Sequence, residues 1–150
     1  SGPDTHYKVL QTIAEAVRIW NKTEDLSELR IWGYRNVWYR FDVDEADIIV
    51  PVTLNSMAIM RSTFNNCYLS QKDASFPSYE FDGPFCDLSQ NIWVNQHKDL
   101  QLLLGRDYWY QNKNPHLRAV HGVVNLKEMN VNQFLSVARK LEQQMEGSPV

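Results

Sequence analysis

The stretch MNVNQFLSVARKLEQQMEG, residues 129–147, carries the clearest structural pattern in the chain. Asn130 is a favoured N-cap residue, and Gln133 stands where its side chain can complete a capping box. Apolar residues follow at three- and four-residue steps, namely Phe134, Val137, Ala138, Leu141 and Met145. The stretch predicts an amphipathic helix that ends at Gly147, with Met129 packed as a staple against Phe134.

A similar pattern lies near the start of the sequence. Apolar residues recur with helical spacing between 4 and 20, namely Leu10, Ile13, Ala14, Val17 and Trp20. Asp4 or Thr5 is suited to cap this segment. We therefore expect amphipathic helices at both ends of the domain.

Between these helices the pattern becomes β-like. Val37–Phe41 is β-branched and aromatic, which is typical of a strand. Ile48–Val52 is a continuous apolar run that predicts a strand buried on both faces, and its Pro51 favours an edge position or a strand end. Further segments resemble short strands at 91–94, 108–110 and 117–124.

Two more helices are expected in the middle of the chain. One begins at a cap on Asn55 or Ser56 and runs to Phe64, and the other covers 98–105, where Gly105 stops it. Helices and strands do not alternate regularly enough for a doubly wound parallel sheet. The sequence therefore predicts an α+β fold, a single compact domain with a mixed sheet of about four to six strands on which the terminal helices pack.

A long connection, 70–89, separates two of these elements. It contains turn residues, and four aromatic residues are interleaved with them: Phe76, Tyr79, Phe81 and Phe85. Long loops in compact domains are uncommon unless they are functional. We expect the rings to hold this segment against the body of the domain as an ordered loop.

The length of 150 residues is that of one domain, which we assign to 4–147. Residues 1–3 resemble the remnant of a cleaved tag, and 148–150 form a short tail. No apolar run approaches the roughly 20 residues of a membrane span, so no membrane partner is expected. The net charge of −3 is spread evenly along the chain, which argues against bulk binding of nucleic acid.

The cysteines and histidines predict neither a metal site nor a cofactor. Cys67 and Cys86 do not make a disulfide framework, and we expect two reduced thiols in an intracellular protein, cytoplasmic or nuclear. Together with His97 they follow no zinc-binding spacing. The histidines are expected to be solvated or hydrogen-bonded: His6, His97, His116 and His121.

Common catalytic motifs are absent from the sequence, including Gly-rich phosphate loops and nucleophile elbows. Asp42 and Asp44 alternate, so on a strand both carboxylates would project to one side and could share a divalent cation. With Gly33 upstream, this pair leaves open a metal-dependent nucleotidyltransferase-like domain. A solvated acidic turn accounts for the same residues, and we expect a protein that is not an enzyme.

The most unusual segment is 30–41, where five of twelve residues are aromatic and three are arginine. These residue types are typical of the cores of protein interfaces, and they also stack on unpaired bases or surround a cationic side chain. Alternation along a strand cannot bury all five rings on one face. We therefore expect part of this segment to be exposed.

These observations predict a non-catalytic protein–protein interaction module, an adaptor or scaffold that docks a partner protein, a peptide or a second copy of itself. A single-stranded RNA-binding domain is the first alternative, and the nucleotidyltransferase-like domain is the second. The predicted partner-binding residues are aromatic or basic, namely Trp32, Tyr34, Arg35, Trp38 and Arg40, with Tyr108 and Trp109 as a second patch.

Overall fold

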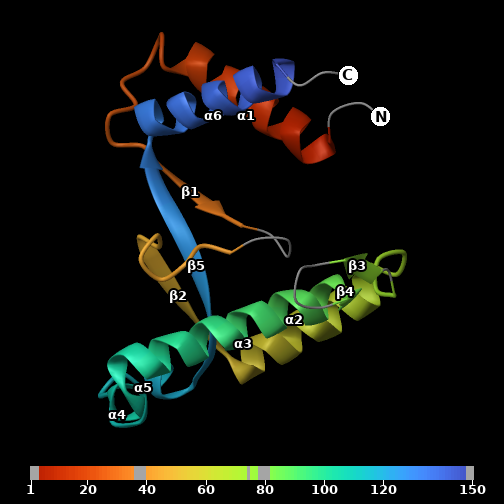
Figure 1. Ribbon diagram of the computed structural model, residues 1–150, viewed down its shortest axis with the longest axis vertical. Coiled ribbons are helices and arrows are strands. Elements are labelled where there is room, and N and C mark those ends of the chain that lie inside the picture. The colour runs from red at the N-terminus through yellow and green to blue at the C-terminus, as the bar shows by residue number, and fades with distance from the viewer. Residues whose placement is uncertain (1–3, 36–39, 74, 78–81, 148–150) are drawn as a thin grey trace. The chain divides into compact units, whose positions relative to one another are not determined.

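The computed structural model describes residues 4–35, 40–73, 75–77 and 82–147, and it confirms the α+β class. The helices of this part of the chain are α1 (Thr5–Trp20), α2 (Leu54–Cys67), α3 (Phe85–Leu104), α4 (Arg106–Tyr110), α5 (Pro115–Arg118) and α6 (Val131–Glu146). Its strands, shown with the helices in Figure 1, are β1 (Arg30–Tyr34), β2 (Ile48–Thr53), β3 (Ser75–Pro77), β4 (Asp82–Pro84) and β5 (Val120–Asn130).

Three strands form an antiparallel sheet in the order β1-β5-β2. β5 is the central strand, and β2 runs antiparallel to it with Ile48 opposite Leu126 and Val50 opposite Val124. β3 and β4 pair separately as a two-stranded sheet. The strands of the described chain are thus divided between two small sheets rather than joined in one mixed sheet.

The chain divides into two compact units. The terminal unit comprises Ser1–Gly33 and Glu128–Val150, and the central unit comprises Tyr34–Lys127. The division falls inside β1 and β5, so each of these strands contributes residues to both units.

The terminal unit is built on the packing of α1 against α6, the two expected terminal helices (Figure 1). Its core consists of Ala14, Phe134 and Ala138. Met129 of β5 packs against this core, as the predicted staple requires. An ion pair adds to the packing, because Arg18 Nη2 lies 3.1 Å from Glu142 Oε2.

The start of α6 confirms the predicted capping box. The backbone N–H of Gln133 donates to Asn130 Oδ1 at 2.8 Å, and the backbone N–H of Asn130 donates to Gln133 Oε1 at 2.9 Å. An N-cap of this kind contributes about 1 kcal/mol to stability. α1 begins differently, because Asp4 makes no side-chain cap bond there.

The central unit contains α2 and α3 side by side, and α3 contributes most of its buried residues. Some of these are polar: Ser89, Gln90, Gln96 and His97. A further hydrophobic cluster joins Leu100 of α3 to Trp109 of α4 and Val123 of β5. α3 is therefore the element that links the helical layer to the central strand.

β5 passes very close to α2 and α3 at Gly122. A Cβ atom at this position would lie 3.0 Å from Trp93 Cβ and 3.1 Å from the backbone carbonyl carbon of Trp93, and it would also collide with the end of Met57. Glycine is therefore required here by the closeness of the helix backbone.

Two segments that the sequence predicts as short strands are helical. Residues 91–94 lie inside α3, and residues 108–110 form the end of α4. In α3 the buried residues Leu88, Gln96 and Leu100 follow helical spacing, but the polar residues among them interrupt the apolar pattern.

The strand β1 ends at Tyr34, before the strand expected at Val37–Phe41, which the structure describes only at its last two residues. Residues 37–39 lie outside the described residues, and Arg40 and Phe41 are not in a strand. The prediction of a strand at 117–124 is correct only from Val120, where β5 begins. The residues before it belong to α5, which ends at Arg118.

β2 is an outer strand of the three-stranded sheet, which confirms the edge position that Pro51 indicates. The strand is not buried on both faces, since Ile49 and Val50 are exposed at this edge. The helix that follows begins two to three residues earlier than expected, because Thr53 is its N-cap and accepts a hydrogen bond from the Ser56 N–H at 3.2 Å.

The connection 70–89 carries more secondary structure than expected. It includes β3, β4 and the first turn of α3. The ring of Phe85 stacks on Phe64 of α2 with ring centroids 5.8 Å apart, which is the aromatic attachment that the sequence predicts. Tyr79 and Phe81 lie outside the described residues.

Both cysteines are free, as expected, with Cys67 exposed and Cys86 buried. Burial raises the pKa of the Cys86 thiol. Across the described residues, no helix has the length and apolar character needed to cross a membrane.

Candidate partner-binding site

The central unit contains a cavity of about 220 Å³ next to one of the predicted sites. Its lining residues come from the end of β1, from α2, α3 and β5: Tyr34, Arg35, Met60, Phe85, Ser89, Ile92, Trp93 and Val124. Tyr34 and Arg35 are predicted partner-binding residues. The cavity therefore connects them to apolar side chains that lie far away in the sequence.

α3 supplies one wall of the cavity. Phe85, Ser89, Ile92 and Trp93 are spaced i, i+4, i+7 and i+8, so they share one face of this helix. Ser89 Oγ donates a hydrogen bond to the Phe85 carbonyl at 2.9 Å, which satisfies its hydroxyl group. The wall that remains is apolar.

Polar contacts between α2 and α3 fix the adjoining wall. The buried Gln90 donates from Nε2 to the Met57 carbonyl at 2.8 Å, and Arg61 Nη2 lies 3.0 Å from Asp87 Oδ1. These contacts join α2 to α3, and Met60 of α2 contributes its side chain to the lining of the cavity.

Tyr34 and Arg35 are the exposed members of the lining, and the Tyr34 side chain is 71% exposed. The guanidinium of Arg35 lies over the Phe41 ring, with its Cζ 4.4 Å from the ring centroid. Arg35 Nη1 also donates to the Arg40 carbonyl at 2.9 Å. The Arg35 side chain is thus fixed in place beside the cavity.

The size and lining of the cavity indicate what it can bind. Pockets for drug-sized ligands usually measure about 300–1,000 Å³ and place several polar groups around the ligand. This cavity is smaller, and Arg35 is the only charged residue among the described residues that line it. Such a cavity suits one apolar side chain from a partner.

The other predicted residues of the 30–41 segment lie in different surroundings. Trp32 belongs to the terminal unit, where its ring is 60% exposed and Nε1 donates to Glu128 Oε1 at 3.0 Å. Arg40 is half-buried, and its carbonyl accepts the bond from Arg35. Trp38 lies outside the described residues.

The second predicted patch is divided between surface and core. Tyr108 is 46% exposed, but Trp109 is only 5% exposed and packs with Leu100 and Val123. Trp109 is therefore a core residue rather than part of a partner-binding patch. These residues form the helix α4 rather than a strand, and α4 packs on Leu100 of α3 and Val123 of β5 through Trp109, which leaves the Tyr108 ring at the surface.

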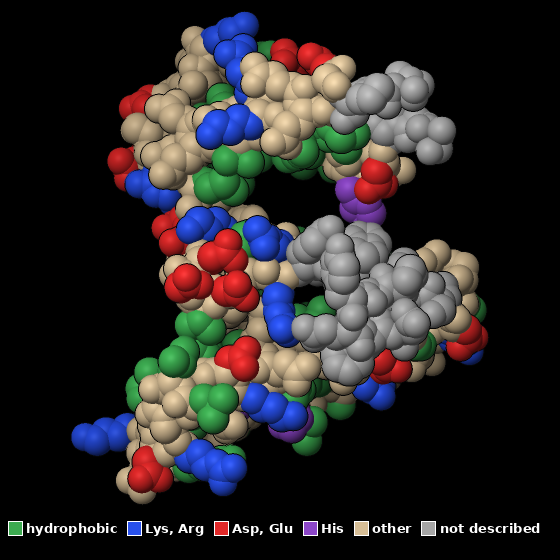
Figure 2. Space-filling view, viewed as in Figure 1, with side chains coloured by type: hydrophobic (Ala, Val, Ile, Leu, Met, Phe, Trp, Pro, Cys, Tyr) green, Lys and Arg blue, Asp and Glu red, His purple; other side chains and the backbone are tan. Residues whose placement is uncertain are grey.

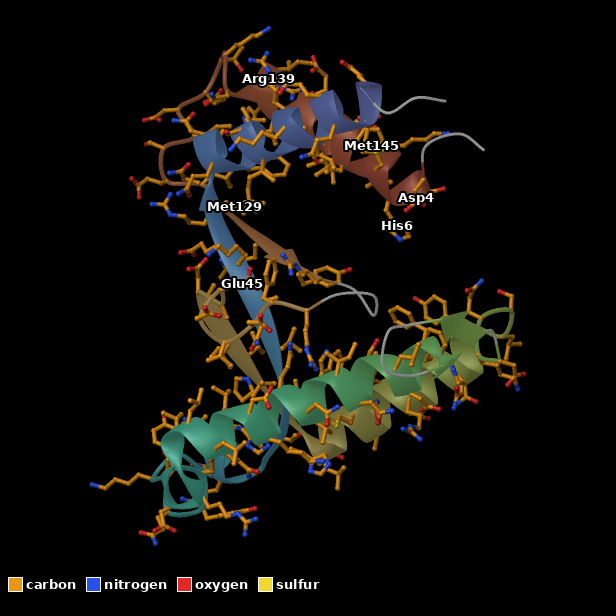
Figure 3. The ribbon with its side chains drawn as sticks, viewed as in Figure 1. Asp4, His6, Glu45, Met129, Arg139 and Met145 are labelled. Carbon is orange, nitrogen blue, oxygen red and sulfur yellow. The ribbon has the colours of Figure 1, made fainter. Side chains whose placement is uncertain are left out.

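The acidic segment before β2 forms a turn. The backbone N–H of Asp42 donates to Glu45 Oε2 at 3.0 Å, and Asp42 and Asp44 are exposed. Figure 2 shows acidic and basic side chains mixed on the visible face, and Figure 3 labels Glu45, which belongs to the turn that precedes β2. The described residues include no cluster of three or more metal-ligating side chains.

A buried histidine lies outside the cavity, in the core of the central unit. His97 meets Trp109 edge to face, with ring centroids 4.8 Å apart. His97 Nε2 and Trp109 Nε1 are buried and make no hydrogen bond within the described residues. Burial holds the pKa of His97 below its ordinary value, although a hydrogen bond to the backbone of His121 acts in the opposite direction.

We expect His97 to make the protein less stable in mild acid. Because the pKa of His97 is lower in the folded protein, the unfolded chain takes up a proton first as the pH falls below about 6.5. This contribution to the free energy of unfolding is complete above that pH and is lost as the pH falls toward the folded pKa. Urea unfolding at about pH 7.5 and about pH 5.5 measures the loss.

The matched variants for this experiment are His97→Gln and His116→Gln. His116 is exposed, so its replacement should leave the acid-dependent loss unchanged. His97→Gln should remove part of the acid-dependent loss of stability. An identical loss in the wild-type protein and in His97→Gln would contradict the assignment.

Six lining residues were missed by the sequence prediction: Met60, Phe85, Ser89, Ile92, Trp93 and Val124. The spacing of 85, 89, 92 and 93 is a helical face, and it was available as a signal. The turn residues of 70–89 indicate a loop and residues 91–94 resemble a strand, so the helical face does not stand out in the sequence. Met60 and Val124 carry no local signal, since only the tertiary fold brings them to the cavity.

Comparisons with known proteins give no match to a family model, to a curated protein or to a solved structure.

Proposed function

We propose that this protein is a non-catalytic interaction module that docks a partner protein or peptide by taking an apolar side chain of the partner into the cavity of the central unit. The observation that carries this proposal is the cavity itself: about 220 Å³, walled by apolar residues, and bordered by the exposed Tyr34 and by Arg35. A central pocket that receives one anchor residue is the arrangement that concentrates binding energy in protein interfaces.

The proposal favours a peptide or protein over a small polar substrate. The hydroxyl of Ser89 already donates to the Phe85 carbonyl, and the other side chains that α3 contributes to the lining are largely apolar: Phe85, Ile92 and Trp93. A small polar substrate that entered the apolar part of the cavity would lose more hydrogen bonds to water than it could regain there, which is unfavourable. An apolar side chain gains free energy from the same transfer.

We also propose that the module acts inside the cell, in the cytoplasm or the nucleus. The support is the presence of two free thiols in a chain that has no need of a disulfide. Reduced cysteines are typical of proteins in reducing compartments.

The test begins with peptides selected on the full chain from a displayed random heptapeptide library. Ile92→Trp should fill the cavity and weaken the binding of selected peptides at least about tenfold, because the anchor loses its pocket. Isothermal titration calorimetry measures the dissociation constant, and thermal unfolding verifies that the variant is folded.

Two variants serve as matched controls. Ile92→Val changes the same position without filling the cavity and should alter affinity less than about threefold. Leu102→Trp adds an indole to the same helix at a residue that is 86% exposed and does not line the cavity. Equal affinity in Ile92→Trp and the wild type, or displacement of the peptides by short single-stranded RNA, would overturn the proposal.

A further inference from the structure

Arg35 brings a positive charge to the edge of an otherwise apolar cavity. We propose that the cavity selects peptides in which a carboxylate lies next to the apolar anchor, and that Arg35 binds this carboxylate. The inference rests on the proposed function, since it names the chemistry of the partner at the same site.

The first support is the hydrogen bonding of the Arg35 guanidinium. A guanidinium carries five N–H donors in a planar fork. Arg35 uses Nη1 for the Arg40 carbonyl, and its remaining donors make no hydrogen bond within the described part of the chain. These donors are the kind that bind carboxylates in bidentate geometry.

The second support is the position of the nearest acidic side chain. Glu45 Oε2 lies 3.9 Å from Arg35 Nη1, which is too long for a hydrogen bond. The same Oε2 atom accepts the N–H of Asp42 at 3.0 Å, so Glu45 is held in its own turn. An incoming carboxylate can therefore approach Arg35 more closely than Glu45 does.

The third support is that Arg35 is already ordered. Its stacking on Phe41 and its bond to the Arg40 carbonyl fix the side chain before a partner arrives. Ordering a free arginine side chain on binding costs conformational entropy, and this cost is reduced here. A carboxylate beside the anchor would meet a positioned charge.

The experiment uses end-capped hexapeptides of the form Gly-Ser-anchor-Glu-Ser-Gly, with Leu, Met, Phe or Trp as the anchor, and the same set with Glu placed before the anchor. Each peptide is paired with one in which Gln replaces Glu. Chemical-shift titration of the isotope-labelled full chain gives the dissociation constants. With the favoured anchor, the Glu peptide should bind about three- to tenfold more tightly than its Gln partner.

Variants of the protein then assign the preference to one side chain. Arg35→Gln should abolish the difference between Glu and Gln peptides, and Arg35→Lys should retain part of it, because it keeps the charge but not the planar fork. Arg139→Gln is the matched control, since it removes one positive charge from the exposed surface of α6 (Figure 3). Thermal unfolding verifies that each variant is folded.

The outcomes separate this inference from the proposed function. If Glu and Gln peptides bind the wild type equally well, and Ile92→Trp weakens both, the docking proposal stands and the carboxylate preference is overturned. The preference is also overturned if it survives in Arg35→Gln. If no hexapeptide binds and library-selected peptides ignore Ile92→Trp, both proposals fail.

Discussion

Replacing Gly122 with valine is expected to lower the free energy of unfolding by about 3 kcal/mol. The added atoms would meet Trp93 at its Cβ and its backbone, and a helix backbone cannot move as a flexible side chain can. The collision with Met57 is less costly, because it involves the free end of a long side chain. Urea unfolding measures the difference.

Gly33→Ala is the matched control for this substitution. A Cβ atom at Gly33 would lie 3.6 Å from Met129 Cε, which is an ordinary contact. The free energy of unfolding should therefore change by less than about 1 kcal/mol. An unchanged urea midpoint in Gly122→Val would contradict the close approach of β5 to α3.

Trp109→Ala should lower the free energy of unfolding by about 3–5 kcal/mol, because it removes a large buried ring and leaves a cavity in the core. The ring is 5% exposed and packs with Leu100 and Val123. This result would separate a core role from the partner-binding role that the sequence predicts for the same residue. Chemical denaturation followed by circular dichroism gives the value.

Tyr108→Ala provides the comparison within the same helix. The Tyr108 ring is 46% exposed and meets Trp109 edge to face, with ring centroids 5.1 Å apart. Loss of that ring pair should cost about 1 kcal/mol. Similar losses in the two variants would show that Trp109 is not the buried member of the pair.

The two terminal helices were predictable because their signals are local. The capping box of Asn130 and Gln133 and the apolar stripe that follows are complete within a few turns of sequence. α3 was predicted only at its end, where Gly105 stops it. Its earlier turns bury Gln90, whose partner is the carbonyl of Met57, and a tertiary partner of this kind leaves no local trace.

The residues of the candidate site also divide into those that the local sequence indicates and those that only the tertiary fold brings together. Tyr34 and Arg35 stand out in the sequence because aromatic and arginine residues are concentrated around them, and both line the cavity. The cavity itself arises where α2, α3 and β5 meet. Trp109 resembles them in sequence and is nevertheless buried, because composition indicates which side chains are suited to an interface and not which of them the fold exposes.

The edge position of β2 has a consequence for solubility in a crowded solution. An outer strand with exposed Ile49 and Val50 is a template on which the strand of another molecule can pair, and repeated pairing leads to aggregates. Pro51 follows these residues directly and has no N–H to give to a new ladder. Pro51 therefore weakens this edge as a template for strand pairing, which is the role of a gatekeeper residue beside an apolar strand.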